Sequence, residues 1–226
     1  SGASDFLVCS VCVDEVRACK DEKERDFMRA VSAINDKAMA RFRGLIKEGV
    51  TEEELASQML AVYKELGADG FSFEPLVGFG ANCAMGHHGP DGTVLKPGDT
   101  VLFDVGCKKD NYCADMTRTF FYKKVLSDKH REIYETVRQA NAAAEAILKP
   151  GVPLCEVDRA ARSVIEKAGY GPNFTHRLGH FIGLEVHEYG DVSSANEETA
   201  KPGNIFSIEP GIYVEGEIGV RIEDLV

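Results

Sequence analysis

The chain has 226 residues, 44% of them hydrophobic, which is enough to bury the core of one large domain or two small ones. Its formal net charge of −11 lacks the basic surface that nucleic acid and anionic membranes attract. No apolar run is long enough to span a bilayer, and no basic segment followed by an apolar one opens the chain. We therefore expect a globular protein of the cytoplasm, with neither nucleic acid nor membrane as partner.

The seven cysteines also favour a reducing compartment, because an odd number does not suit a disulfide framework in a chain of this length. Cys9 and Cys12 form one C-x-x-C motif, but a structural zinc site would need a second such pair, and the sequence has none. We interpret this motif as packing or chance, within a segment 1–12 that we expect to be an N-terminal remnant or linker.

Four helices are predicted from apolar residues spaced three and four apart and from their capping residues. The first spans 21–48 and ends at Gly49. Thr51 and Glu54 form a capping box that opens the second, which runs to Gly67. Ser127 caps the third, which stops at Pro150-Gly151, and the fourth spans about 153–169.

The two helical pairs have the same register, which predicts an internal duplication. A shift of 102 residues aligns 45–50 with 147–152, Glu54 with Glu156 and Gly67 with Gly169. Sequence of β type follows each pair, at 71–80 and 100–122 in the first half and at 181–186 and 204–226 in the second. We expect an α+β fold with halves of about 21–125 and 127–226, whose helices pack on a shared antiparallel sheet.

Two aspartates are predicted to face each other on a hairpin of the first half. Residues 100–104 and 112–121 are apolar strands, and 106–111 supplies turn residues, so Asp104 and Asp115 come side by side. An unpaired carboxylate directly after Val-Leu-Phe would be costly to bury. A strand-end cap at Asp104 with a surface charge at Asp115 is the alternative, and the pair alone does not decide between them.

Three histidines and two glutamates follow in the second half. His176, His180 and His187 cluster around the predicted apolar strand 181–186, which favours metal binding or proton transfer over ordinary core histidines. Glu209 and Glu223 each end an apolar strand, with a turn at 215–219 between them. Four carboxylates and one imidazole would repel each other unless cations lay between them. The set therefore predicts a site for two divalent metal ions, formed by Asp104, Asp115, His180, Glu209 and Glu223.

These segments together resemble the pita-bread metallopeptidases, which have the creatinase/aminopeptidase fold. The family includes methionine aminopeptidases, aminopeptidase P and the Xaa-Pro dipeptidases, or prolidases. The order and spacing of the motifs are similar to the Xaa-Pro branch from about residue 13 to the end. The matching segments are Asn82-Cys-Ala-Met-Gly-His87-His-Gly-Pro, Pro97-Gly-Asp-Thr-Val-Leu-Phe-Asp104-Val-Gly, Ala114-Asp115-Met-Thr-Arg-Thr-Phe, His176-Arg-Leu-Gly-His180-Phe-Ile-Gly-Leu-Glu-Val-His187-Glu, Ser207-Ile-Glu209-Pro-Gly-Ile-Tyr and Val220-Arg-Ile-Glu223-Asp.

The resemblance implies that residues 13–226 are a catalytic domain of two pseudo-symmetric halves around a central antiparallel sheet. Members of the Xaa-Pro branch usually carry an N-terminal domain that helps to close the cleft and to form dimers, and they continue for another strand after the last ligand. We expect both segments to be missing here, so the sequence does not decide whether the chain forms a homodimer.

The resemblance also assigns the ligands. It implies that Asp104 binds one metal ion, that Asp115 and Glu223 bridge both, and that His180 and Glu209 complete the other. Mixed oxygen and nitrogen ligands suit Mn²⁺ or Co²⁺, with Zn²⁺ or Fe²⁺ as alternatives.

Catalytic roles follow from the same comparison. Water held between two metal ions becomes a hydroxide at neutral pH that can attack the peptide carbonyl, and Glu209 is our candidate to carry protons. By resemblance, His87 and His187 stabilise the intermediate and His176 lines a proline pocket. We expect Arg221 to orient a ligand carboxylate. The spacing to Asp104 selects His87 over His88, which we expect to be an exposed loop residue.

The predicted function is hydrolysis of the bond between an N-terminal residue and proline in small peptides, by a manganese-dependent Xaa-Pro dipeptidase or aminopeptidase P. A methionine aminopeptidase is the nearest alternative, since those enzymes also lack a large preceding domain. A metal-free pita-bread binding module and a creatinase-like hydrolase are disfavoured, because all five ligands are present.

Overall fold

The capping residues found in the sequence, Thr51 and Ser127, each precede a helix of the structure, and Asp21, which was not identified as a cap, does so as well. In the computed structural model, which describes residues 9–86 and 88–226, Asp21 and Thr51 each form a complete capping box, and the Ser127 side chain accepts a hydrogen bond from the backbone of His130. All four predicted helices are confirmed. The described helices are α1 (Ser10–Ala18), α2 (Glu22–Leu45), α3 (Glu52–Glu65), α4 (Asp128–Ile147) and α5 (Leu154–Lys167), with short 3-10 helices η1 (Gly80–Ala84) and η2 (Gly171–Asn173).

The sequence did not predict α1. Residues 10–12 of the expected linker are its first turn, and residues 1–8 of that linker lie outside the described part of the chain. The segment is held by ion pairs to Glu188, whose carboxylate lies 2.8 Å from Arg17 and 2.8 Å from the buried Lys20 ammonium. These contacts attach the N-terminal segment to the second half of the molecule, 168 or more residues away along the chain.

The strands form short antiparallel sheets, and β3 lies at the centre of the first half. It pairs with β2 on one side and with β6 on the other, with Asp104 opposite Thr117. The turn between β4 and β5 is tighter than expected, with positive φ at Asp110 and Asn111, as a two-residue hairpin turn requires. The described strands are β1 (Gly70–Phe71), β2 (Leu76–Phe79), β3 (Thr100–Val105), β4 (Cys107–Lys109), β5 (Tyr112–Cys113), β6 (Met116–Phe121), β7 (Gly179–Phe181), β8 (Glu188–Val192), β9 (Ser207–Ile208), β10 (Gly211–Val214), β11 (Ile218–Arg221) and β12 (Asp224–Leu225).

The predicted strand at 181–186 is wrong. Strand β7 ends at Phe181, and the following residues turn, with the Gly183 amide donating to the Glu185 carbonyl at 3.0 Å. The Glu188 carboxylate accepts the Leu184 amide at 2.9 Å. The apolar run is therefore explained by Ile182, which is fully buried in the core of the first half, while Leu184 is exposed.

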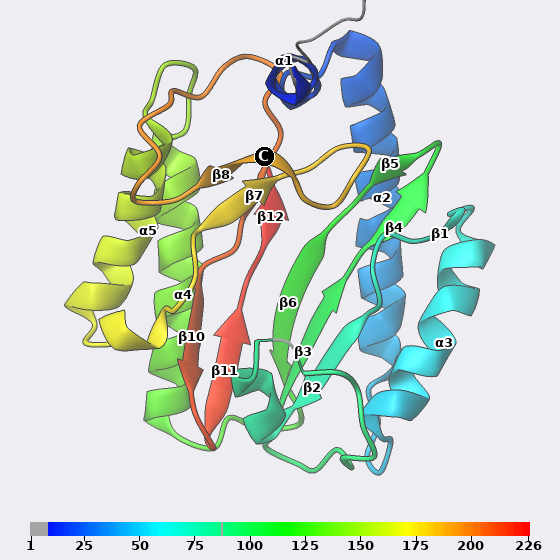
Figure 1. Ribbon diagram of the computed structural model, residues 1–226. Coiled ribbons are helices and arrows are strands. Elements are labelled where there is room, and N and C mark those ends of the chain that lie inside the picture. The colour runs from blue at the N-terminus through cyan, green and yellow to red at the C-terminus, as the bar shows by residue number, and fades with distance from the viewer. Residues whose placement is uncertain (1–8, 87) are drawn as a thin grey trace, which may run out of the picture.

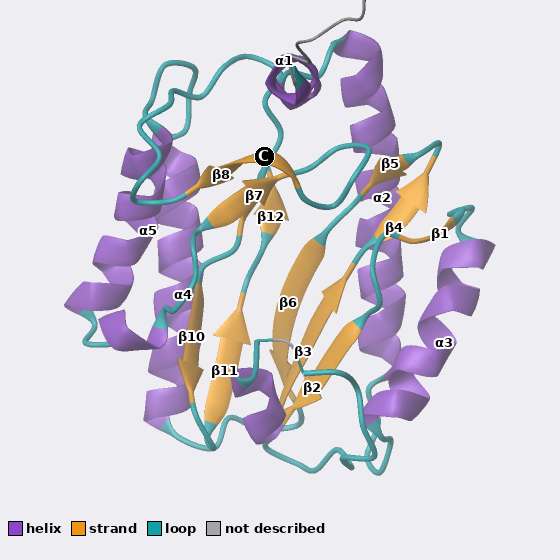
Figure 2. Ribbon diagram, viewed as in Figure 1, coloured by secondary structure: helices purple, strands orange, loops and turns teal. Residues whose placement is uncertain are grey.

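Each half has its own hydrophobic core, and the two halves meet along β6 and β11 (Figures 1 and 2). Helices α2 and α3 lie with the strands of the first half, on the right of Figure 1, and α4 and α5 lie with those of the second half, on the left. At the seam, the Glu223 amide donates to the Thr117 carbonyl at 3.1 Å. Beside the seam, Gly219 permits the close approach of β11 to η1, because a Cβ there would lie 1.8 Å from the Cys83 carbonyl oxygen. The α+β prediction of two related halves around antiparallel strands is confirmed.

All seven cysteines are free thiols in the structure, and Cys9 and Cys12 are exposed. Within residues 9–86 and 88–226, helices that combine the length and the apolar character of a membrane span are absent.

The loop between β2 and β3 is anchored by the buried carboxylate of Glu52 in the first turn of α3. One oxygen of Glu52 accepts the Phe79 amide at 2.7 Å and the Asn82 side chain at 3.0 Å. The other accepts the His88 ring at 2.6 Å and the Asp91 amide at 3.1 Å. One side chain thus holds the start of the loop and its middle together. The expectation of an exposed His88 is wrong, because this hydrogen bond leaves only 12% of its side chain accessible.

We predict that Glu52→Ala destabilises the fold, because it leaves the Phe79 and Asp91 amides without their acceptor. The expected cost is about 3 kcal/mol, or a Tm lower by about 6–12 °C, measurable by thermal unfolding. Glu53→Ala, at an exposed neighbour in the same helical turn, is the control and should change stability by less than about 0.5 kcal/mol. Equal Tm values for the two variants would contradict this role of Glu52.

Candidate active site

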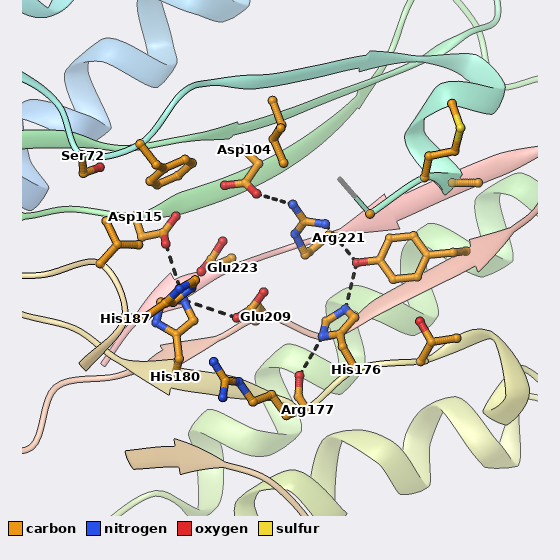
Figure 3. Close-up of a pocket in the computed structure, with 18 of the residues that line it drawn as sticks. Ser72, Asp104, Asp115, His176, Arg177, His180, His187, Glu209, Arg221 and Glu223 are labelled. Atoms are coloured by element: carbon orange, nitrogen blue, oxygen red, sulfur yellow. Dashed lines mark hydrogen bonds and ion pairs between the residues drawn. The ribbon is translucent and has the colours of Figure 1, made fainter. Parts of the chain in front are cut away.

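Five different segments bring the candidate ligands to one cavity of about 1020 Å³. Asp104 lies in β3 and Asp115 just before β6, while His180 lies in β7. Glu209 follows β9 and Glu223 follows β11. Figure 3 shows all five side chains directed into the same space. The structure therefore brings together the whole set that the sequence predicted.

His180 has its Nε2 atom aimed at the carboxylates. This atom lies 3.6 Å from Asp115 Oδ2 and 3.6 Å from Glu209 Oε1. The other ring nitrogen, Nδ1, donates to the Phe181 carbonyl at 3.2 Å, which leaves a lone pair on Nε2. Burial lowers the pKa of His180 to about 4, so the ring is neutral. The Nε2 lone pair of His180 therefore faces the oxygens of Asp115 and Glu209, and a cation between them could bind all three atoms.

Two buried oxygen atoms support the same conclusion. Asp115 Oδ1 and Glu223 Oε1 lack a hydrogen-bond donor among the described residues. Burial raises the pKa of both carboxyl groups, and their negative neighbours raise it further. Burial also raises the pKa of Glu209 to about 7. When no cation is bound, protons must neutralise these carboxylates. Divalent metal ions can replace those protons, so the oxygen and nitrogen donors of the site fit such ions.

Asp115, His180 and Glu223 each offer a ligand atom, and these atoms lie within 4.8 Å of one another. Asp104 and Glu209 line the same cavity. Glu52, His88 and Asp91 are a second acidic group of comparable size. There the Glu52 oxygens are already saturated by N–H donors, so this second group anchors a loop.

Arg221 holds Asp104 in place, as expected for a residue that orients a ligand. Arg221 is 5% exposed, and its guanidinium contacts Asp104 Oδ2, Thr117 Oγ1 at 3.0 Å and the Tyr213 hydroxyl at 3.0 Å. The Tyr213 hydroxyl in turn lies 2.9 Å from His176 Nε2, and His176 Nδ1 donates to the Arg177 carbonyl at 2.7 Å. Burial lowers the pKa of His176 to about 4, which keeps it neutral in this chain of contacts.

The sequence missed three hydroxyl groups that position the candidate ligands. Thr117 donates to Glu223 Oε2 at 2.6 Å, and Ser207 donates to Glu209 Oε1 at 3.0 Å. Tyr213 joins Arg221 to His176. Thr117 lies two residues after Asp115, and Ser207 lies two before Glu209, so period-2 spacing on each strand was the available signal.

His187 lies at the same cavity, with its ring centroid 4.2 Å from that of His180 and nearly perpendicular to it. Burial lowers its pKa, and the positive charge of Arg177 lowers it further. His87, its predicted partner, lies outside the described residues, so its role stays a prediction.

With this site in view, comparison with known proteins identifies the class. The model of metallopeptidase family M24 matches residues 26–226, and the chain belongs to that family. Its pita-bread fold is shared by solved structures. They include an X-Pro aminopeptidase from Thermotoga maritima, at a TM-score of 0.94 and 36% identity, and a prolidase from Pyrococcus furiosus, at 0.95 and 35%. Each match covers 98% of this chain, and 63% and 65% of those proteins, respectively.

A curated relative from Bacillus subtilis, named "Putative dipeptidase YkvY", is 42% identical over 224 residues. The alignment covers 99% of this chain and 61% of that protein. The chain thus spans less than two thirds of the length of these relatives.

We predict that metal binding releases protons. In the metal-free protein the raised pKa values of Asp115, Glu209 and Glu223 keep protons at the site near neutral pH, and a cation displaces them. The apparent affinity for Mn²⁺ should fall about tenfold per pH unit below pH 7 for each proton displaced. Titration calorimetry at pH 6 and pH 8, in buffers of different ionisation enthalpy, measures both quantities. Equal affinities and no proton release would contradict the prediction.

Proposed function

We propose that this chain is the catalytic part of an Xaa-Pro dipeptidase or aminopeptidase P that hydrolyses the bond between an N-terminal residue and proline. The observation that carries the proposal is the buried ligand set at a large cavity, in which Asp115 Oδ1 and Glu223 Oε1 receive no hydrogen bond from the described residues. Membership of family M24 and likeness to proteins named prolidase and X-Pro aminopeptidase support it. The seven free cysteines support a cytoplasmic setting.

Asp104, Asp115, His180, Glu209 and Glu223 would hold two divalent metal ions. Four carboxylates with one imidazole favour Mn²⁺, because oxygen-rich sites suit that ion. Bound ions would supply a water molecule of lowered pKa and polarise the scissile carbonyl.

Glu209 is the proposed proton carrier of the reaction. Its carboxylate borders the cavity from which substrate would approach, which is where a general acid or base must lie. Ser207 fixes one of its oxygens at 3.0 Å, which sets the direction of the carboxylate.

His187 and His176 have different proposed tasks. Neutral His187, at the rim of the cavity, can donate a hydrogen bond to the carbonyl oxygen as negative charge develops there, and His87 would assist. His176 is fixed through Tyr213 to Arg221, so it offers a rigid wall for the proline ring. The named relatives favour this assignment over a methionine aminopeptidase, and the oxygens without donors argue against a metal-free binding module.

The direct test is hydrolysis of Ala-Pro, Ala-Pro-Ala and a methionyl peptide by protein reloaded with Mn²⁺. We expect Ala-Pro to be cleaved by a dipeptidase and Ala-Pro-Ala by an aminopeptidase P, with the methionyl peptide spared in either case. Preferred cleavage of the methionyl peptide would replace the proposal by its alternative. If Mn²⁺ does not bind at all, the catalytic interpretation fails.

Glu209→Gln tests the proposed proton carrier. The kcat for Ala-Pro should fall at least about 100-fold, because general acid–base catalysis contributes that much or more. Glu197→Gln, at an exposed glutamate away from the cavity, should retain wild-type kcat. Manganese content of both variants, measured by atomic emission, separates loss of proton transfer from loss of metal. Full activity of Glu209→Gln with metal bound would remove Glu209 from this role.

A further inference from the structure

Two arginines line the cavity, and they differ in their contacts. Arg221 is buried and committed to Asp104, Thr117 and Tyr213. Arg177 is exposed. Its backbone carbonyl accepts a hydrogen bond from His176 Nδ1, but its guanidinium makes no hydrogen bond or ion pair with the residues that the structure describes. Within that part of the chain, lysine does not occur in the lining. Arg177 is therefore the lining cation that can meet an anionic group of a substrate.

The backbone that carries Arg177 is rigidly held. Buried Asp158 accepts the Leu178 amide at 3.2 Å and forms two hydrogen bonds with Arg162. Arg162 also donates to the His176 carbonyl at 3.0 Å. The residues on both sides of Arg177 are thus fixed to α5. Its side chain projects from a fixed point, so a partner bound by the guanidinium would be held in a defined place.

Figure 3 places the Arg177 side chain on the side of the cavity where His180 and Glu209 lie. The positive charge of Arg177 acts on two side chains of the site, His187 and Glu209. After the larger effect of burial, it contributes to the lowered pKa of His187, and it partly opposes the raised pKa of Glu209. The guanidinium is close enough to interact with a substrate whose reacting bond lies among these side chains.

The remaining lining is strongly acidic, with carboxyl groups at Asp104, Asp115, Glu209, Glu215 and Glu223. A dipeptide brings its own carboxylate, on the proline directly after the scissile bond. A longer peptide has an uncharged amide at that position. A free carboxylate in an acidic cavity requires a cation, and the planar guanidinium matches a carboxylate with two parallel hydrogen bonds.

Resting on the function proposed above, we propose that Arg177 binds the free carboxylate of the proline in an Xaa-Pro dipeptide and so selects dipeptides over longer peptides. The residue acts in substrate binding, with no part in bond cleavage. It stabilises the ground state and the transition state equally, so its removal should raise KM and leave kcat nearly unchanged.

The test compares wild-type protein with Arg177→Met and Arg177→Lys, all loaded with Mn²⁺, on Ala-Pro and on its C-terminal amide. Wild-type protein should prefer the acid over the amide by about 10- to 100-fold in kcat/KM, the range of a charged hydrogen-bonded pair. Arg177→Met should lose this preference through KM on Ala-Pro and keep its rate on the amide within about twofold. Arg177→Lys should keep part of the preference that Arg177→Met loses, because lysine retains the positive charge but not the planar group that forms two parallel hydrogen bonds.

Arg159→Met is the matched control, since it removes the same charge from an exposed position of α5 where Arg159 pairs with Glu156. It should leave both substrates unaffected. A merely structural role of Arg177 would lower activity on acid and amide alike, and that result overturns the proposal. So would equal use of acid and amide by wild-type protein.

If wild-type protein cleaves neither compound, the proposed function fails, and binding still decides the role of Arg177. Titration calorimetry of the manganese-loaded protein should then show tighter binding of Ala-Pro than of its amide, with the difference lost in Arg177→Met. Equal binding of the two compounds by wild-type protein overturns the inference.

Discussion

The structure depends on one electrostatic constraint, the burial of several carboxylates where its two halves meet. Asp115 and Glu223 are buried, and each has an oxygen without a donor among the described residues. Isolated buried charges would cost more than a domain of this size can tolerate, so the seam needs a cation or protons to be stable. Close approach of β11 to η1, through Gly219, brings Glu223 to the aspartates of the first half.

The walls around this seam follow a common principle, because three surrounding loops are each held by a buried carboxylate. Glu52 fixes the loop between β2 and β3, Asp158 fixes the segment that carries His176, and Glu188 fixes the turn before β8. Such anchors keep side chains at defined positions without metal ligation. Rigid loops preorganise a site for binding and catalysis, which is consistent with a small, uniform class of substrates.

Local signals in the sequence predicted more than long-range ones. Helix caps and the hairpin around Asp104 were predictable, because they depend on neighbouring residues. The strand expected at 181–186 was wrong, since an apolar run does not reveal that Ile182 enters the core of the other half. The anchor at Glu52 was missed, because an acid in the first helical turn looks like an exposed residue that favours the helix dipole. Its buried partners come from loops that no spacing rule connects.

Anomalous X-ray diffraction from crystals grown with Mn²⁺ would locate the metal ions at this seam. We expect two manganese peaks in the cavity, with Asp115 and Glu223 in contact with both and Asp104, His180 and Glu209 each in contact with one. An empty cavity, or a single peak beside Glu52 and His88, would contradict this expectation.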